Sequence, residues 1–318
     1  MDDYFLNKIH SQYSSNIISQ KNRPYLIAEI GLNHNRDIEL AQKMIHEAAS
    51  CGANAVKFQS YTTDLFINNQ VPDARVLYSI FKKYELNYVD HEILQNEAKK
   101  VGLDFISTPL TVDWVEHLAM LKAPFIKIAS GDINNYLLLK EVVKKKVPLI
   151  ISTGNSKLSE IASAASFFRV FNKKDVIFLH CISEYPASTH ILNLSTIPFL
   201  HDQLKALIGF SDHSDGSDAA FASVLLGAVV VEKHFTLDKS LPGPDHAISS
   251  TPAELREIRK KIDLALIMRG EPRTEPYQEE KSGDVLGKRS IYNINGKLIP
   301  MRPRKHGLPK DSDYLDMI

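Results

Sequence analysis

The segment Gly209-Phe210-Ser211-Asp212-His213 follows a short apolar run, Ala206-Leu207-Ile208, and the same transition recurs about twenty residues later. There Val229-Val230-Val231 leads into Glu232-Lys233-His234-Phe235-Thr236. An apolar run that breaks into a polar cluster is typical of a buried parallel strand that emerges at a functional rim. The two segments therefore predict neighbouring parallel strands, each with a histidine at its carboxyl end.

These two histidines, His213 and His234, are candidate ligands of one metal ion. Neutral imidazole is the commonest metal ligand, and a site with two imidazoles leaves positions open for substrate oxygens. The alternative is two unrelated histidines, one of which caps a helix. The pair alone does not decide between the two interpretations.

Six further segments have the same apolar, β-branched character, and they span residues 25–31, 55–59, 104–109, 125–131, 148–154 and 176–181. Amphipathic patterns separate the eight runs and predict helices over 38–51, 90–101, 133–146, 158–171, 193–204, 215–227 and 252–269. The first follows Asp37 as N-cap, and the last follows a capping box formed by Thr251 and Glu254.

Eight strand-like runs interleaved with helices predict a (β/α)8 TIM barrel rather than an open doubly wound sheet. No Gly-x-Gly-x-x-Gly follows the first strand, which disfavours a dinucleotide-binding fold. Active sites of this barrel lie at the carboxyl ends of its strands. The polar residues found there are therefore candidates for catalysis and binding.

The composition is that of an ordinary globular protein with 318 residues, 38 basic and 38 acidic side chains. This charge balance favours neither a nucleic acid nor a membrane surface as partner. Cys51 and Cys181 lack metal or redox spacing, which indicates a reducing compartment. Without an apolar leader or a run long enough to span a bilayer, the expected location is the cytoplasm.

We expect four segments: a polar N-terminal stretch (1–22), the catalytic barrel (23–270), a linker (271–288) and a short tail (289–318). The tail is too short to be an ordinary domain. Within the barrel the connection over 61–89 is long, and it is either a lid or binding loop or a solvated excursion.

Two lysines, Lys57 and Lys127, lie inside otherwise apolar strands. A buried ammonium requires an anionic partner. Either Glu29 and Glu232 neutralise the lysines in a structural network, or the lysines await an anionic ligand. Hydroxyl side chains at equivalent strand ends favour a phosphate- and carboxylate-bearing substrate, because they supply donors to such oxygens.

The strand-end motifs, taken in order, resemble those of the sialic acid synthase family. The matching segments are 28–35, 56–59, 107–109, 127–132, 152–154, 180–186, 209–213, 232–236 and 243–246. The resemblance implies an enzyme that condenses phosphoenolpyruvate with an N-acylated hexosamine, releases phosphate and forms a nine-carbon 2-keto-3-deoxy acid. It also implies a divalent metal, Mn²⁺ or Mg²⁺, bound by His213 and His234, which polarises the sugar aldehyde.

The resemblance also implies roles for residues at matching positions. The catalytic residues would be Glu29, Lys57, Lys127 and Asp245, and the substrate-binding residues would be Thr108, Ser130, Asp132, Ser152, Ser183, Tyr185, Ser211, Arg302 and Arg304. Glu29 would bind a sugar hydroxyl or move a proton, and Asp245 would lie near the metal or its water.

The family usually carries a small antifreeze-protein-like domain that reaches into the barrel of a partner subunit, which implies a homodimer. Here the corresponding tail is truncated, and Arg302 or Arg304 would contact the N-acyl group of the sugar in trans. Alternatively the acceptor site is open and the sugar is different. Ser183 stands where some members that make N-acetylneuraminate carry Asn, so the identity of the acceptor stays open.

Two other functions fit the same residues. A Schiff-base aldolase would use Lys127 or Lys57 as its nucleophile. A non-catalytic sugar-binding homologue would be marked by the shortened tail. Cys181 is expected to be a small interior residue, and His34 and His180 either line the sugar site or pack at the rim.

Overall fold

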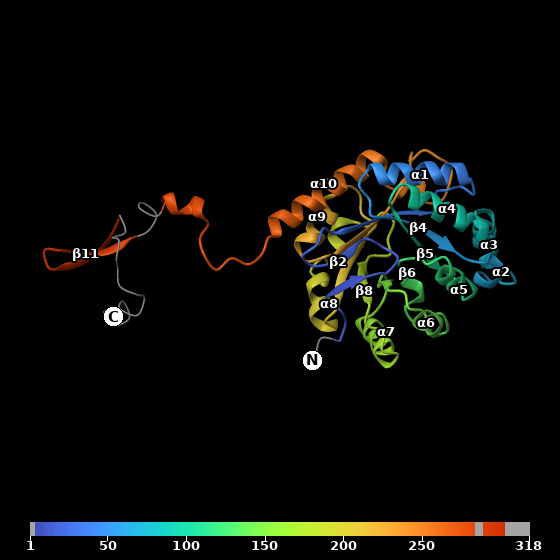
Figure 1. The fold of residues 1–318 in the computed structure, drawn as a ribbon, viewed down its shortest axis with the longest axis horizontal. Helices are drawn as coiled ribbons and strands as arrows, with labels where there is room; N and C mark the ends of the chain where they lie inside the picture. Colours follow the sequence, from blue (N-terminus) through green and yellow to red (C-terminus); the bar gives the residue numbers. More distant parts are fainter. Residues whose placement is uncertain (1–3, 284–288, 303–318) are drawn as a thin grey trace. The chain divides into compact units, whose positions relative to one another are not determined.

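The computed structural model describes residues 4–283 and 289–302, and its chain divides into two compact units. The first unit ends at Arg269 and the second begins at Gly270. The first unit is a closed barrel surrounded by helices (Figure 1).

Eight parallel strands form the barrel, and the last of them pairs with the first to close it. They are β3 (Tyr25–Gly31), β4 (Ala55–Ser60), β5 (Asp104–Pro109), β6 (Ile126–Ile128), β7 (Leu149–Ser152), β8 (Val176–Cys181), β9 (Leu207–Asp212) and β10 (Val230–His234). Each expected apolar run overlaps one of these strands. The predicted (β/α)8 fold is confirmed.

The outer layer consists of helices whose apolar faces pack on the strands. They are α1 (Ile38–Ser50), α4 (Tyr88–Lys100), α5 (Asp113–Met120), α6 (Tyr136–Val143), α7 (Leu158–Val170), α8 (Thr196–Leu204), α9 (Asp218–Leu225) and α10 (Pro252–Arg269). Short 3-10 turns precede or follow them: η2 (Ser130–Asp132), η3 (Thr189–Ile191) and η4 (His246–Ile248). Two large apolar clusters between helices and strands form the core of this layer.

Local capping explains where the helices begin. The Asp37 side chain accepts a hydrogen bond from the Leu40 N–H, and Glu254 accepts one from the Thr251 N–H, as the sequence predicts. The helix expected to begin at residue 133 begins instead at Tyr136, because Asn135 accepts from the Leu138 N–H and serves as N-cap.

The N-terminal segment folds into a hairpin of β1 (Lys8–His10) and β2 (Ile17–Ser19). Its Ile9 and Ile18 are buried in one apolar cluster with residues near the beginnings of the barrel strands. The carboxylate of Asp104, at the beginning of β5, accepts hydrogen bonds from Ser14 and Asn16 of the hairpin segment. The hairpin thus closes the amino end of the barrel.

The long connection after β4 is largely helical. It contains α2 (Thr63–Phe66), η1 (Pro72–Ala74) and α3 (Arg75–Tyr84). Tyr61, Phe66 and Phe81 pack against one another with ring centroids 5.1–5.8 Å apart. This aromatic cluster gives the connection a small core of its own.

The second unit contains η5 (Gln278–Gly283) and a hairpin of β11 (Ser290–Ile294) and β12 (Lys297–Met301). Asn295 and Gly296 form the turn with positive φ at both positions, 53° and 80°, which suits a two-residue hairpin. Residues 303–318 of the expected tail, including Arg304, lie outside the described residues. Among the described helices none is both long and apolar enough to traverse a bilayer.

Candidate active site

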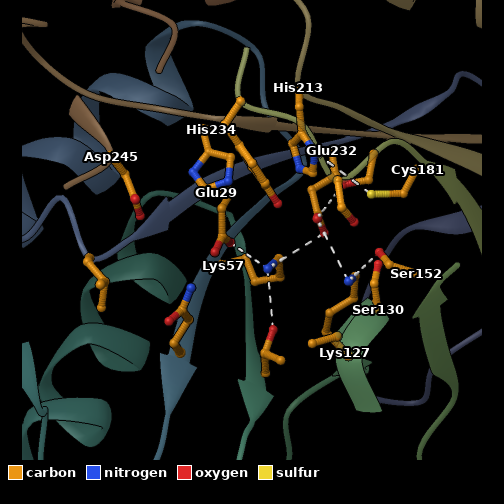
Figure 2. A pocket seen from close by; sticks show the side chains of 18 of the residues that line it. Glu29, Lys57, Lys127, Ser130, Ser152, Cys181, His213, Glu232, His234 and Asp245 are labelled. Atoms are coloured by element: carbon orange, nitrogen blue, oxygen red, sulfur yellow. Dashed lines mark hydrogen bonds and ion pairs between the residues drawn. The ribbon is translucent and has the colours of Figure 1, made fainter. Parts of the chain in front are cut away.

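A cavity of about 600 Å³ opens at the carboxyl ends of the barrel strands. Twelve of the residues that the sequence predicts for the site line this cavity: Glu29, Lys57, Thr108, Lys127, Ser130, Ser152, Ser183, Tyr185, Ser211, His213, His234 and Asp245. Figure 2 shows the central part of this arrangement. Residues spread over more than 200 positions of sequence therefore meet in one mouth.

Of the three other predicted site residues, the structure describes two. Asp132 lies in η2, outside the cavity lining, and its carboxylate accepts a hydrogen bond from the Asn135 amide. Arg302 follows β12 in the second unit, where it is exposed. Arg304 falls outside the described residues.

Strand register brings the charged groups together. Glu29 of β3 is the cross-strand neighbour of Lys57 of β4 and of His234 of β10. At the end of β3, Gly31 has a φ of 52°, and a Cβ there would lie 3.2 Å from a Glu29 carboxylate oxygen and 3.3 Å from one of Asp245. Glycine is needed at this point because a side chain would be strained and would crowd two site carboxylates.

Lys57 belongs to an ion-pair network. Its Nζ lies 2.7 Å from Glu29 Oε2 and 3.7 Å from Glu232 Oε2, and it donates a hydrogen bond of 3.3 Å to the Thr108 hydroxyl. All these side chains are buried. The contacts of Lys57 match the first of the two alternatives, in which Glu29 and Glu232 neutralise the lysine in a structural network.

Lys127 is bound less tightly to carboxylates. Its Nζ donates hydrogen bonds to the Ser152 hydroxyl, 2.6 Å away, and to the Ile128 carbonyl at 3.2 Å. The carboxylate recorded as its ion-pair partner, Glu232, lies 3.8 Å away. Burial lowers the pKa of Lys127. Binding of an anionic ligand would therefore stabilise the ammonium of Lys127 more than that of Lys57.

The two carboxyl groups of the network differ in acidity. Burial raises the pKa of Glu29 to about 7, and Lys57 opposes this rise. Burial also acts on Glu232, but Lys127 and Lys57 outweigh it and lower the pKa of Glu232 to about 2. Glu232 therefore keeps its charge, while Glu29 can exchange a proton near neutral pH.

The imidazoles of His213 and His234 have ring centroids 5.6 Å apart. His213 Nδ1 donates to the Ile182 carbonyl at 2.7 Å, which leaves the Nε2 lone pair of the same ring for a ligand. His234 Nδ1 is buried and has no hydrogen-bond partner among the described residues. Burial lowers the pKa of both rings, so both are neutral, as metal binding requires.

These observations fit a divalent ion held by two imidazoles. The described part of the chain has no group of three or more His, Cys, Asp or Glu side chains suited to hold a metal. The remaining positions around an ion at this pair would be left to water or to substrate oxygens. The metal itself stays a prediction.

A family model described as the NeuB family matches residues 44–274. The chain belongs to the NeuB family. It is 36% identical over 281 residues to an N,N'-diacetyllegionaminic acid synthase from Legionella pneumophila. The alignment covers 84% of this chain and 79% of the relative. It is also 36% identical over 285 residues to an N-acetylneuraminate-9-phosphate synthase from Drosophila melanogaster, covering 86% of this chain and 77% of the relative.

A solved NeuB-like structure has the same fold. The N-acetylneuraminic acid synthetase of Leptospira borgpetersenii, crystallised with citrate, aligns with a TM-score of 0.81 and 33% identity over 86% of this chain and 94% of that one. The resemblance to sialic acid synthases that the sequence predicts is confirmed. This NeuB-family chain is accordingly a biosynthetic enzyme.

Sequence reasoning named Glu232 as a possible partner of the two lysines but did not include it among the residues of the NeuB site. Glu232 faces both lysines and accepts a hydrogen bond of 2.9 Å from Ser211. Its neighbour Lys233 instead pairs with Asp212 at 2.9 Å and is absent from the cavity lining. The alternation of side chains along β10 could have separated the two, since residues 232 and 234 share one face of the strand.

The surroundings of three other residues decide the roles that the sequence left open for them. Cys181 lines the cavity, and burial raises the pKa of its thiol, which disfavours a thiolate nucleophile. His34 accepts a hydrogen bond from the Arg36 N–H, and His180 donates one to the Leu192 carbonyl. Neither histidine lines the cavity, so both are packed side chains.

Proposed function

We propose that this enzyme condenses phosphoenolpyruvate with an N-acylated hexosamine and releases phosphate, forming a nonulosonic 2-keto-3-deoxy acid. One observation carries the proposal: two buried lysines, a set of hydroxyls and two neutral imidazoles line the same cavity. Family membership gives independent support.

In this proposal the anionic substrate is bound at Lys127. The Ser152 hydroxyl already contacts the ammonium. The Ser130 hydroxyl oxygen accepts a hydrogen bond of 2.9 Å from the Gly154 N–H, which holds the serine at the cavity wall. Ser211 and Thr108 add hydroxyl donors to the same cavity. Charge-assisted hydrogen bonds of this kind suit phosphate and carboxylate oxygens.

The acceptor aldehyde would lie beside His213 and His234. A Mn²⁺ or Mg²⁺ ion held by the two imidazoles would polarise the aldehyde carbonyl. Tyr185 packs on the His213 ring, with centroids 4.1 Å apart, and so keeps that ring in place. Glu29, whose pKa is close to neutrality, would transfer a proton to or from a sugar hydroxyl.

The reaction balances with water as third reactant. C3 of phosphoenolpyruvate bonds to the aldehyde carbon as the enol double bond opens, and the oxygen of one water bonds to C2. The C2–O bond to phosphate then breaks as the C2 carbonyl forms. Of the two protons that the water loses, one goes to the oxygen of the new hydroxyl and the other to the departing phosphate. Lys127 would stabilise the negative charge carried by the phosphate, and Lys57 would add its positive charge to the same cavity while it stays paired with Glu29.

Phosphate release tests the proposal directly. The protein is incubated with phosphoenolpyruvate, Mn²⁺ or Mg²⁺ and a panel of N-acylated hexosamines, and both phosphate and product mass are measured. We expect equimolar phosphate and keto acid only when all components are present. No phosphate from any acceptor in the panel would contradict the proposal.

A Schiff-base aldolase is a second candidate, because burial lowers the pKa of Lys127 and so favours a nucleophilic amine. Borohydride treatment in the presence of the keto-acid product separates the two mechanisms. A stable adduct on Lys127 or Lys57, with activity that survives a strong chelator, would support the aldolase. No adduct and loss of activity with the chelator would support the synthase.

The proposal includes a homodimer, and its support is the family resemblance alone. Sedimentation equilibrium across a range of protein concentrations measures the mass. A mass of one chain at all concentrations would contradict the dimer without touching the proposed chemistry.

A further inference from the structure

Lys233 lies on the side of β10 that faces away from the cavity. Its sequence neighbours Glu232 and His234 line the cavity (Figure 2), whereas Lys233 is absent from the described lining. Val231 and Phe235, two positions before and after it, belong to the apolar cluster between the barrel and its helices. Lys233 is only 3% exposed. An ammonium buried among hydrocarbon side chains costs free energy, so it requires contacts that offset this cost.

The ammonium of Lys233 contacts the two residues that flank His213. Its Nζ donates a hydrogen bond of 2.9 Å to Asp212 Oδ2 and another to the Ser214 carbonyl. The second carboxylate oxygen of Asp212 accepts hydrogen bonds from the N–H and the hydroxyl of Ser214, at 2.9 and 2.6 Å. The backbone on both sides of His213 is therefore tied to the residue that directly precedes His234.

Strand pairing alone leaves the separation of the two histidines open. The register between β9 and β10 ends at the pair Asp212 and Lys233, one position before each histidine. On its other side, His213 is held by the segment after β8. Its Nδ1 donates to the Ile182 carbonyl at 2.7 Å, and its own carbonyl accepts from the Ala187 N–H at 2.8 Å. These contacts join His213 to β8, and the side chain of Lys233 joins it to β10.

We propose that Lys233 is a positioning residue, which sets the separation of the His213 and His234 imidazoles at which both bind one divalent ion. This inference rests on the proposed function and deepens its metal site. The two ring centroids lie 5.6 Å apart, and displacement of either ring would leave the ion with a single imidazole. Loss of a group that orients a metal ligand typically weakens metal binding by about 10- to 100-fold. The alternative is that the pair of Lys233 and Asp212 serves the fold alone.

A double substitution separates these two roles. Lys233→Met alone would leave the Asp212 carboxylate buried and unpaired, which is strongly destabilising. Lys233→Met combined with Asp212→Asn removes both charges at nearly constant volume, and the amide oxygen can still accept from Ser214. We expect this variant to unfold near the wild-type temperature without metal but to bind Mn²⁺ at least about tenfold more weakly in calorimetric titration. The Mn²⁺ concentration that gives half-maximal phosphate release should rise by the same factor.

The matched control is a buried lysine with the same kinds of contact at the opposite end of the barrel. Lys173, which precedes β8, lies 3.0 Å from the Asp175 carboxylate and donates a hydrogen bond to the Lys145 carbonyl. Lys173→Met combined with Asp175→Asn should leave the affinity for Mn²⁺ unchanged. An equal loss of Mn²⁺ affinity in this control would show that removal of any such pair disturbs the site, and would contradict the specific role of Lys233.

Wild-type Mn²⁺ affinity in the folded variant lacking the Lys233 pair would overturn the inference and leave the proposed function intact. A wild-type protein that binds neither Mn²⁺ nor Mg²⁺ would overturn both the inference and the metal in the proposed function. If the double variant does not fold, Ser214→Ala decides, because it keeps the ion pair and removes only the hydroxyl that bonds to Asp212. We expect Ser214→Ala to weaken Mn²⁺ binding by about two- to tenfold, the value of one hydrogen bond. Unchanged binding in this variant would overturn the inference.

Discussion

The two ends of the barrel both bury side chains, but the buried side chains are of opposite kinds. At the amino end, Ile9 and Ile18 of the β1–β2 hairpin pack with Tyr25 and Phe125 in an apolar cluster. At the carboxyl end, four charged side chains are buried as well: Glu29, Lys57, Lys127 and Glu232.

This difference shows that stability and chemistry are provided by separate regions. Burial of apolar surface at the amino end stabilises the fold at about 25 cal/mol for each Å². Burial of charge at the carboxyl end costs free energy that ion pairs recover only in part. Substitutions at the mouth should therefore change activity more than stability, and those at the hairpin should do the reverse.

The largest effect on activity is expected from His213→Ala. Loss of one of two imidazoles should abolish turnover and Mn²⁺ binding, because a single protein ligand cannot hold the ion. The fold should survive, since the ring lies at the rim rather than in an apolar cluster. Phosphate release, calorimetric Mn²⁺ titration and thermal unfolding measure the three properties. Undiminished turnover would refute the role given to His213.

Ile18→Ala tests the opposite end of the barrel. Truncation of a fully buried isoleucine should lower the free energy of unfolding by about 2–5 kcal/mol. With saturating substrates, kcat should stay at the wild-type value because the hairpin is remote from the strand ends that form the site. Urea denaturation measures the first quantity, and Leu137→Ala at an exposed position is the control. A marked fall in kcat with unchanged stability would break the separation of the two ends.

Lys127→Met keeps the length of the side chain but removes its charge. We expect phosphoenolpyruvate affinity to fall by about 2 kcal/mol, the value of one charged hydrogen bond. The network around Lys57 should remain, because Lys57 pairs with Glu29 independently. Isothermal titration with phosphoenolpyruvate measures the affinity. If it does not change, Lys127 serves only the structural network.

Much of the barrel could be predicted from the sequence. Each buried strand is an apolar run that ends in polar residues, and the order of these breaks indicates one mouth. Eleven of the twelve predicted site residues that line the cavity lie in a barrel strand or just after its end, whereas Asp245 was assigned from the family resemblance alone. The local signal is strong because, at the end of each strand, the apolar run gives way to polar residues within about six positions.

Features that depend on contacts between distant segments could not be predicted. The hairpin strands have three residues each, too few for a periodic pattern, and Asp104 holds the hairpin segment from ninety positions away. Glu232 could be named from the sequence as a partner of the lysines, but its central position among its contacts requires the register of four strands. Likewise, Leu32 and Tyr61, which follow different strands, meet in one apolar cluster. Such features follow from the tertiary fold rather than from local sequence.

The smallest expected effect is a pH dependence of stability caused by Glu29. Its pKa of about 7 in the folded chain lies above the ordinary value of 4.5, so the folded state binds more protons than the unfolded state between these two pH values. The free energy of unfolding should therefore fall as pH rises through that window, by at most about 1.4 kcal/mol for each pH unit. Lys57 and Lys127 weaken the effect and Glu232 strengthens it.

Glu29→Gln isolates this contribution, because it removes the titrating group but keeps an oxygen that can accept from Lys57. We expect the difference in unfolding free energy between the variant and the wild type to grow in favour of the variant from pH 5 to pH 7. Urea unfolding at several pH values measures it, with Glu39→Gln on the exposed face of α1 as control. A difference that stays constant over the window would mean that Glu29 remains ionised beside Lys57. Glu29 would then act as a fixed charge in the site rather than as a group that exchanges a proton.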